Sequence, residues 1–100
     1  MIGSPAISLD RHRVRQRDAE DVVELLLEEA RKSGASLALW VQAGGEFKVT
    51  ADGGPAHAWM REHEPLALVG VYGPDAYKAD ILEAVWKRCE VIGMEWPRGE

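Results

Sequence analysis

The most regular hydrophobic pattern in the chain covers residues 18–33, where apolar side chains recur at intervals of three and four positions. This spacing places them on one face of an α-helix. The stripe consists of Val22, Val23, Leu26, Leu27 and Ala30. Asp18 is a favourable N-cap residue, and Ser33-Gly34 provides a suitable end. The pattern therefore predicts an amphipathic helix that begins at Asp18 and ends near Ser33.

Two segments of strand character follow, residues 37–43 and 46–51, with Gly44-Gly45 between them. Two glycines in this position favour a two-residue hairpin turn, because glycine accepts positive φ without steric cost. Such a turn pairs Trp40 with Val49 and places the Trp40 side of the first strand in the core. The first strand is predicted to lie inside the sheet and the second at its edge.

The opposite side of the first strand is also apolar, since it carries Leu37, Leu39 and Val41. An uncovered apolar strip beside an edge strand promotes association. We therefore expect this strip to be covered by a terminal segment, with Met94 and Trp96 as candidates, or to be buried in a homodimer.

The second half of the chain predicts a short helix, a strand and a longer helix. Residues 55–63 start with proline, which is favourable in the first turn of a helix, and Pro65 ends the segment. Residues 66–72 are continuously apolar, as expected of a central strand covered on both faces. Gly73-Pro74 is predicted to open the last helix, which carries an apolar stripe and ends at Gly93.

These elements predict an α+β protein with a small antiparallel or mixed sheet, packed by two main helices and one short helix. Residues 6–14 alternate in a way that suits an additional strand, which gives the order (β)αββαβα. With that strand the pattern is ferredoxin-like, and without it the pattern is profilin-like. The 100 residues form one predicted domain, 1–100, with residues 1–5 and 97–100 expected to be flexible.

Composition is that of a folded soluble protein, with 46% hydrophobic and 29% charged residues. The chain contains no apolar run of the roughly 18 residues that suggest a membrane span, and its N-terminus does not resemble a signal peptide. We therefore expect a cytoplasmic location. The single Cys89 cannot form an intramolecular disulfide, and we expect no bound cofactor.

Positive charge is concentrated near the N-terminus of an acidic chain of net charge −5. Arginines occupy every second position from 11 to 17, directly before a helix whose Glu20, Glu24 and Glu28 form a like-charged ridge. We first interpret the arginines as neutralising this ridge. An acidic protein partner or the phosphates of a nucleic acid are the alternatives.

Candidate catalytic chemistry is limited to residues 57–64, which contain His57, Glu62, His63 and Glu64. The two histidines are six positions apart and do not share a helix face, so a surface helix explains them better than a metal site. We therefore expect a small non-enzymatic protein-interaction or regulatory module that binds a protein partner and is compatible with a homodimer. A nucleic-acid-associated protein is the alternative, and a metal-dependent or acid–base enzyme around His57 and His63 is the third. The candidate partner-binding residues are Arg11, Arg13, Arg15, Arg17, Trp59 and Trp96.

Overall fold

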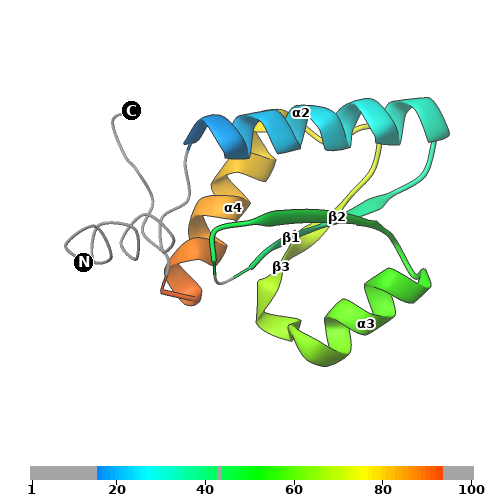
Figure 1. Ribbon diagram of the computed structural model, residues 1–100. Helices are drawn as coiled ribbons and strands as arrows, with labels where there is room; N and C mark the ends of the chain where they lie inside the picture. Colours follow the sequence, from blue (N-terminus) through cyan, green and yellow to red (C-terminus); the bar gives the residue numbers. More distant parts are fainter. Residues whose placement is uncertain (1–15, 43, 94–100) are drawn as a thin grey trace, which may run out of the picture.

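The computed structural model describes residues 16–42 and 44–93, and it shows an α+β fold as predicted (Figure 1). The elements, in chain order, are α2 (Gln16–Ser33), β1 (Leu37–Val41), β2 (Phe47–Ala51), α3 (Pro55–His63), the 3-10 turn η1 (Pro65–Ala67), β3 (Leu68–Tyr72) and α4 (Lys78–Val91). The three strands form one antiparallel sheet in the order β2-β1-β3. The predicted strand at residues 6–14 lies outside the described residues.

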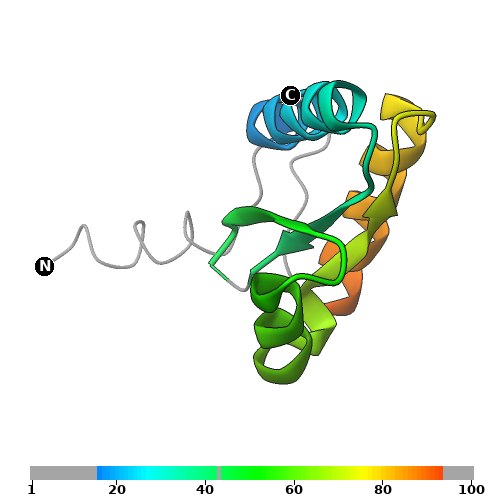
Figure 2. The same ribbon diagram turned by 90° about the vertical axis from the view of Figure 1, so that its right-hand side faces the viewer.

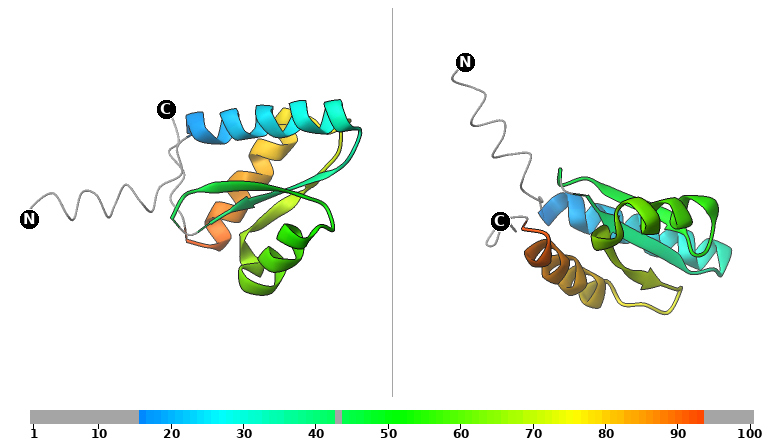
Figure 3. Two further views of the ribbon diagram at one scale, coloured as in Figure 1. Left: turned by 45° about the vertical axis from the view of Figure 1, so that its right-hand side comes forward. Right: turned by 90° about the horizontal axis from the view of Figure 1, so that it is seen from below.

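The sheet lies between two helical layers, with α2 and α4 on one face and α3 on the other (Figures 2 and 3). The larger core joins β1 to both α2 and α4. Its fully buried members include Val23, Leu26, Leu39, Val41, Ile81 and Val85. A smaller core on the opposite face contains Ala38, Trp40, Met60 and Ala67. In a ferredoxin-like arrangement the helices share one face, so the position of α3 departs from that pattern.

The Leu37, Leu39 and Val41 strip, which was expected to need a terminal segment or a homodimer as cover, is covered by α2 and α4. The candidate cover residues Met94 and Trp96 lie outside the described residues. Leu39 and Val41 are fully buried, and Leu37 is partly buried against the same core formed by α2 and α4. An amphipathic helix must bury its apolar stripe against another element. Here the stripe of α2 meets this strip of β1, so each provides the cover that the other needs.

The hairpin register differs by one residue from the prediction, because Trp40 lies opposite Lys48 and not opposite Val49. The amide of Gln42 donates to the carbonyl of Glu46 at 2.8 Å, which leaves three chain positions, 43–45, for the connection. Gly45 has φ 87°, the left-handed conformation that commonly completes a three-residue hairpin loop. A one-residue shift moves every β2 side chain to the other face of the sheet. Lys48 therefore shares a face with Trp40.

The strand at residues 68–72 was predicted to be central, but in the described part of the chain β3 is an edge strand and β1 is central. Its first predicted residues form η1 instead, because the proline turn continues through Ala67. Val71 is 42% exposed, so one side of β3 lacks the expected cover.

Within β3, a Cβ on Gly70 would lie 2.5 Å from the Tyr72 hydroxyl oxygen. Because glycine has no side chain, position 70 leaves free the space that the end of the Tyr72 side chain occupies.

The helix boundaries show where local signals were sufficient. Helix α3 has the predicted bounds, with Pro55 in its first turn. Helix α2 begins at Gln16, two residues before the predicted cap. Helix α4 begins at Lys78, later than predicted, because residues 73–76 form a turn closed by the bond from the Ala76 amide to the Gly73 carbonyl. None of the helices in the two described ranges is long and apolar enough to cross a membrane.

Candidate protein-interaction surface

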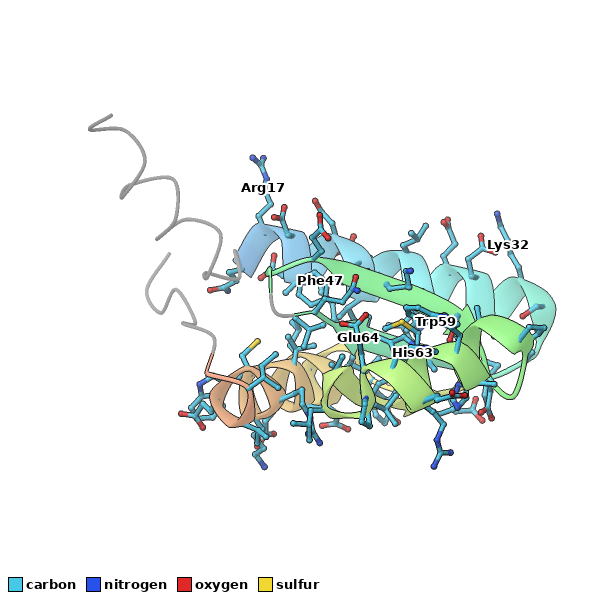
Figure 4. All side chains as sticks on the ribbon, turned by 60° about the horizontal axis from the view of Figure 1, so that its bottom comes forward. Arg17, Lys32, Phe47, Trp59, His63 and Glu64 are labelled. Atoms are coloured by element: carbon cyan, nitrogen blue, oxygen red, sulfur yellow. The ribbon has the colours of Figure 1, made fainter. Side chains whose placement is uncertain are left out.

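Helix α3 has an inner side that contacts the sheet and an outer side that carries an exposed tryptophan. His57 and Met60 are buried on the inner side, whereas Trp59 is 51% exposed. The Trp59 and His63 rings are stacked, with centroids 4.2 Å apart and planes inclined by 14° (Figure 4). His63 Nδ1 lies 2.9 Å from the carbonyl oxygen of Trp59, and since a carbonyl only accepts, Nδ1 is the donor. The exposed indole is therefore held in place by its own helix.

A shallow apolar groove lies beside Trp59, between α3 and β2. Its volume is about 260 Å³, and it is lined by Lys48, Ala56, Trp59 and Met60. Met60 is 1% exposed and belongs to the smaller core, so the groove has a fixed apolar base. Lys48 is the one charged residue in this lining. The sequence prediction included Trp59 but not Lys48, because the predicted register, with Trp40 opposite Val49, placed Lys48 on the other face of the sheet.

Beneath the groove, Trp40 of β1 contacts both β2 and α3. This side chain is fully buried, and its Nε1 donates a hydrogen bond to Thr50 Oγ1 at 2.9 Å. The His57 ring meets Trp40 edge-on, at a centroid distance of 5.3 Å and an angle of 71°. Nδ1 of His57 is buried and has no hydrogen-bond partner among the residues that the structure describes. Trp40 thus links β1 to β2 and to α3, which fixes the distance between the walls of the groove.

The outer edge of β2 provides backbone groups next to the groove. In the described ranges β2 pairs with β1 alone, so its other edge carries no strand there. Antiparallel pairs alternate between hydrogen-bonded and non-hydrogen-bonded types. Gln42 and Glu46 form a bonded pair, so the N–H and C=O groups of Phe47, Val49 and Ala51 point away from β1. These groups are positioned to pair with an added strand.

The arginine series is only partly within the described residues, since Arg11, Arg13 and Arg15 lie outside them, as does Trp96. Arg17 is exposed in the first turn of α2, so the alternation expected of a strand does not extend to it. Figure 4 shows Arg17 at the start of α2, well separated from Trp59 on α3. The structure therefore does not bring these two predicted residues into one site.

The acidic ridge of α2 has a cationic partner that the sequence did not reveal. Lys78, the first residue of α4, donates a hydrogen bond to Glu24 and forms an ion pair with it. The hydrogen bond to Glu24 raises the pKa of Lys78, and the charges of Glu20 and Asp21 act in the same direction. The cation comes from a helix distant in the sequence, so spacing along the chain could not have predicted the pair.

The histidines considered for catalysis do not form a common site. His57 is buried against Trp40, whereas His63 lies on the surface against Trp59. Across residues 16–42 and 44–93 no group of three or more His, Cys, Asp or Glu side chains could hold a metal ion. Cys89 is fully buried, and desolvation raises the pKa of its thiol to about 11. At neutral pH this thiol is protonated and shielded from reagents.

Comparison of the chain with protein-family models, with curated proteins and with solved structures gave no match.

Proposed function

We propose that this protein is a small non-enzymatic interaction module that binds a protein partner through the outer side of α3 and the adjacent edge of β2. The observation that carries this proposal is the half-exposed Trp59, held by His63 beside an apolar groove. Tryptophan is enriched among the residues that dominate binding energy at protein interfaces. A side chain that is already ordered also loses less conformational entropy on binding. Trp59 is therefore suited to anchor a partner.

The size of the groove favours a protein partner over a small-molecule ligand. Pockets that enclose small molecules usually measure about 300–1,000 Å³. The groove beside Trp59 is below that range at about 260 Å³, and Lys48 of the edge strand β2 forms part of its lining. It can take one side chain from a partner whose remaining contacts lie on the surrounding surface.

Nucleic-acid binding receives less support from the described residues. Arg17 is followed by Asp18, Glu20 and Asp21, and a phosphate backbone would be repelled by this acidic group. That alternative now depends on Arg11, Arg13 and Arg15, which lie outside the described residues.

The proposal is tested by affinity capture from a native lysate with three forms of the full chain, followed by mass spectrometry. Trp59→Ala should lose the captured partner, whereas Tyr77→Ala should retain it. Tyr77 is a matched control because it is an aromatic residue, 73% exposed, located before α4 and away from the groove. Unchanged capture by Trp59→Ala, with all three forms folded by circular dichroism, would exclude the proposed surface.

A further inference from the structure

Resting on the function proposed above, we infer that the partner presents an extended acidic peptide segment to the edge of β2. The segment adds to the sheet as a further strand and places one apolar side chain in the groove beside Trp59. This mode combines main-chain hydrogen bonds, which supply affinity, with a side-chain pocket, which supplies specificity. Both components are next to each other on this surface.

The backbone of β2 provides the first component. The outward N–H and C=O groups of Phe47, Val49 and Ala51 recur every second residue, at the spacing that an added antiparallel or parallel strand can match. The side chains of these residues point to the α2 side of the sheet. Lys48 and Thr50 point to the α3 side, so alternate side chains of an added strand would also face α3.

The groove provides the second component, and its size decides between a strand and a helix as the occupant. An α-helix with its side chains is about 10–12 Å across and inserts several side chains along one face. The groove is about 260 Å³ and is bounded by one residue of β2 and three of α3. A single apolar side chain on a strand fits this geometry, and a row of helix anchors does not.

The charges at the groove favour acidic residues in the added strand, on either side of its apolar anchor. Lys48 is its one charged lining residue, and its edge-strand position brings the ammonium group beside any strand added there. His63, on which Trp59 stacks, is not itself part of the groove lining. The acidic residue that follows, Glu64, already accepts a hydrogen bond from Gln42 Nε2 at 2.9 Å. A carboxylate on the added strand, on the same face as the apolar anchor, would therefore pair with Lys48.

A second copy of the chain is a less favourable occupant of the same edge. Antiparallel pairing of two β2 strands centred on Val49 would place Lys48 of each copy opposite Thr50 of the other and bring two ammonium groups onto one short face. Lysine on an edge strand is a common device against edge-to-edge association. An acidic segment removes this repulsion, whereas β2 itself carries no acidic residue.

The test uses phage-displayed heptapeptides selected on the full chain, with the library randomised at the central position and at the positions two residues before and after it. Clones that also bind Trp59→Ala are discarded. We expect the selected peptides to have an apolar residue at the centre and Asp or Glu at one or both flanking positions. In the purified full chain, Trp59→Ala should weaken binding of a selected peptide about thirtyfold, which corresponds to a truncation cost of about 2 kcal/mol. Lys48→Glu should shift selection from acidic to basic flanking residues.

Strand addition has a signature that docking of an isolated side chain does not share. N-methylation of alternate amides in a selected peptide should abolish binding when those amides face β2, and should leave it nearly unchanged when they face away. Equal effects of the two methylation patterns, basic flanking residues, or no Trp59-dependent clones would overturn the inference. The inference would also be overturned if the chain without peptide sedimented as a dimer and Val49→Pro disrupted that dimer. This result would assign the edge of β2 to a second copy of the chain. If lysate capture still depends on Trp59, failure of the peptide test leaves the proposed function standing, and failure of both tests removes it.

Discussion

The hydrogen bond between Trp40 and Thr50 should be one of the strongest local contributions to stability, because both partners are buried. Trp40 is fully buried and Thr50 is 6% exposed. Thr50→Val removes the acceptor and leaves the indole N–H buried without a partner, which costs about 1–3 kcal/mol. Trp40→Phe removes the donor and part of the ring system, and the same Thr50→Val change should be nearly neutral in that background. The two substitutions should therefore show a coupling free energy of about 1–3 kcal/mol.

The measurement is urea unfolding of the four proteins of this double-mutant cycle, followed by far-ultraviolet circular dichroism because the number of tryptophans changes. Thr50→Ser is the control, since it keeps the hydroxyl oxygen that Trp40 contacts. The expected cost of Thr50→Val is a large part of a total stability that is about 5–15 kcal/mol for typical domains. Strictly additive effects, or a loss below about 0.5 kcal/mol for Thr50→Val alone, would refute the assignment of this contact.

Three further predictions concern single sites outside the groove. Gly70→Ala should lower stability by about 1–3 kcal/mol in thermal unfolding, because its Cβ would lie 2.5 Å from the Tyr72 hydroxyl oxygen, and Tyr72→Leu should relieve much of this loss. Lys78→Gln should lower stability slightly at low salt and not at high salt, because its ion pair with Glu24 is exposed to solvent. Since the pKa of Lys78 is raised in the folded state, this contribution is complete below the ordinary lysine pKa of 10.5 and is lost as pH rises through the folded value. Cys89 should resist alkylation at pH 8 until denaturant is added, and because burial raises its pKa from 9.0 to about 11, the stability from keeping it protonated should fall across that interval.

Local sequence patterns were sufficient for the helices and for the class of fold. The stripe of α2 and the proline at the start of α3 each depend on residues close together in the chain, and both predictions are confirmed. The buried stripe of α4 is also confirmed at Ile81, Val85 and Cys89. Periodicity reports which side of an element is buried, and that information is local.

The register of the hairpin and the position of β3 in the sheet were harder to predict. The register depends on the length of one turn, and the position of β3 depends on the order of the strands. Gly44-Gly45 suggested a two-residue turn, but the positive φ of Gly45 belongs to a longer connection, and the register moved by one. The apolar run at residues 66–72 did not show that β3 would lie beside β1 with only one neighbour in the described sheet. Alternation within a strand cannot identify which strand lies next to it.

The same limitation explains what was missed at the candidate site. Trp59 was a candidate from its residue type alone, whereas Lys48 was assigned to the wrong face. The ion pair of Lys78 with Glu24 joins two helices and depends on packing that no local pattern shows. Residues of α3 and β2 become one surface only when the hairpin register is known.

Site-specific photo-crosslinking in cells that make the protein would test the central claim most directly. A benzophenone amino acid at Ala56, an exposed residue that lines the groove, should give one discrete adduct that Trp59→Ala suppresses. The same probe at Glu28, exposed on α2 and on the opposite side of the sheet, should give no such adduct. An equal yield from both positions, or an adduct from position 28 alone, would contradict the assignment of the partner surface to α3 and β2.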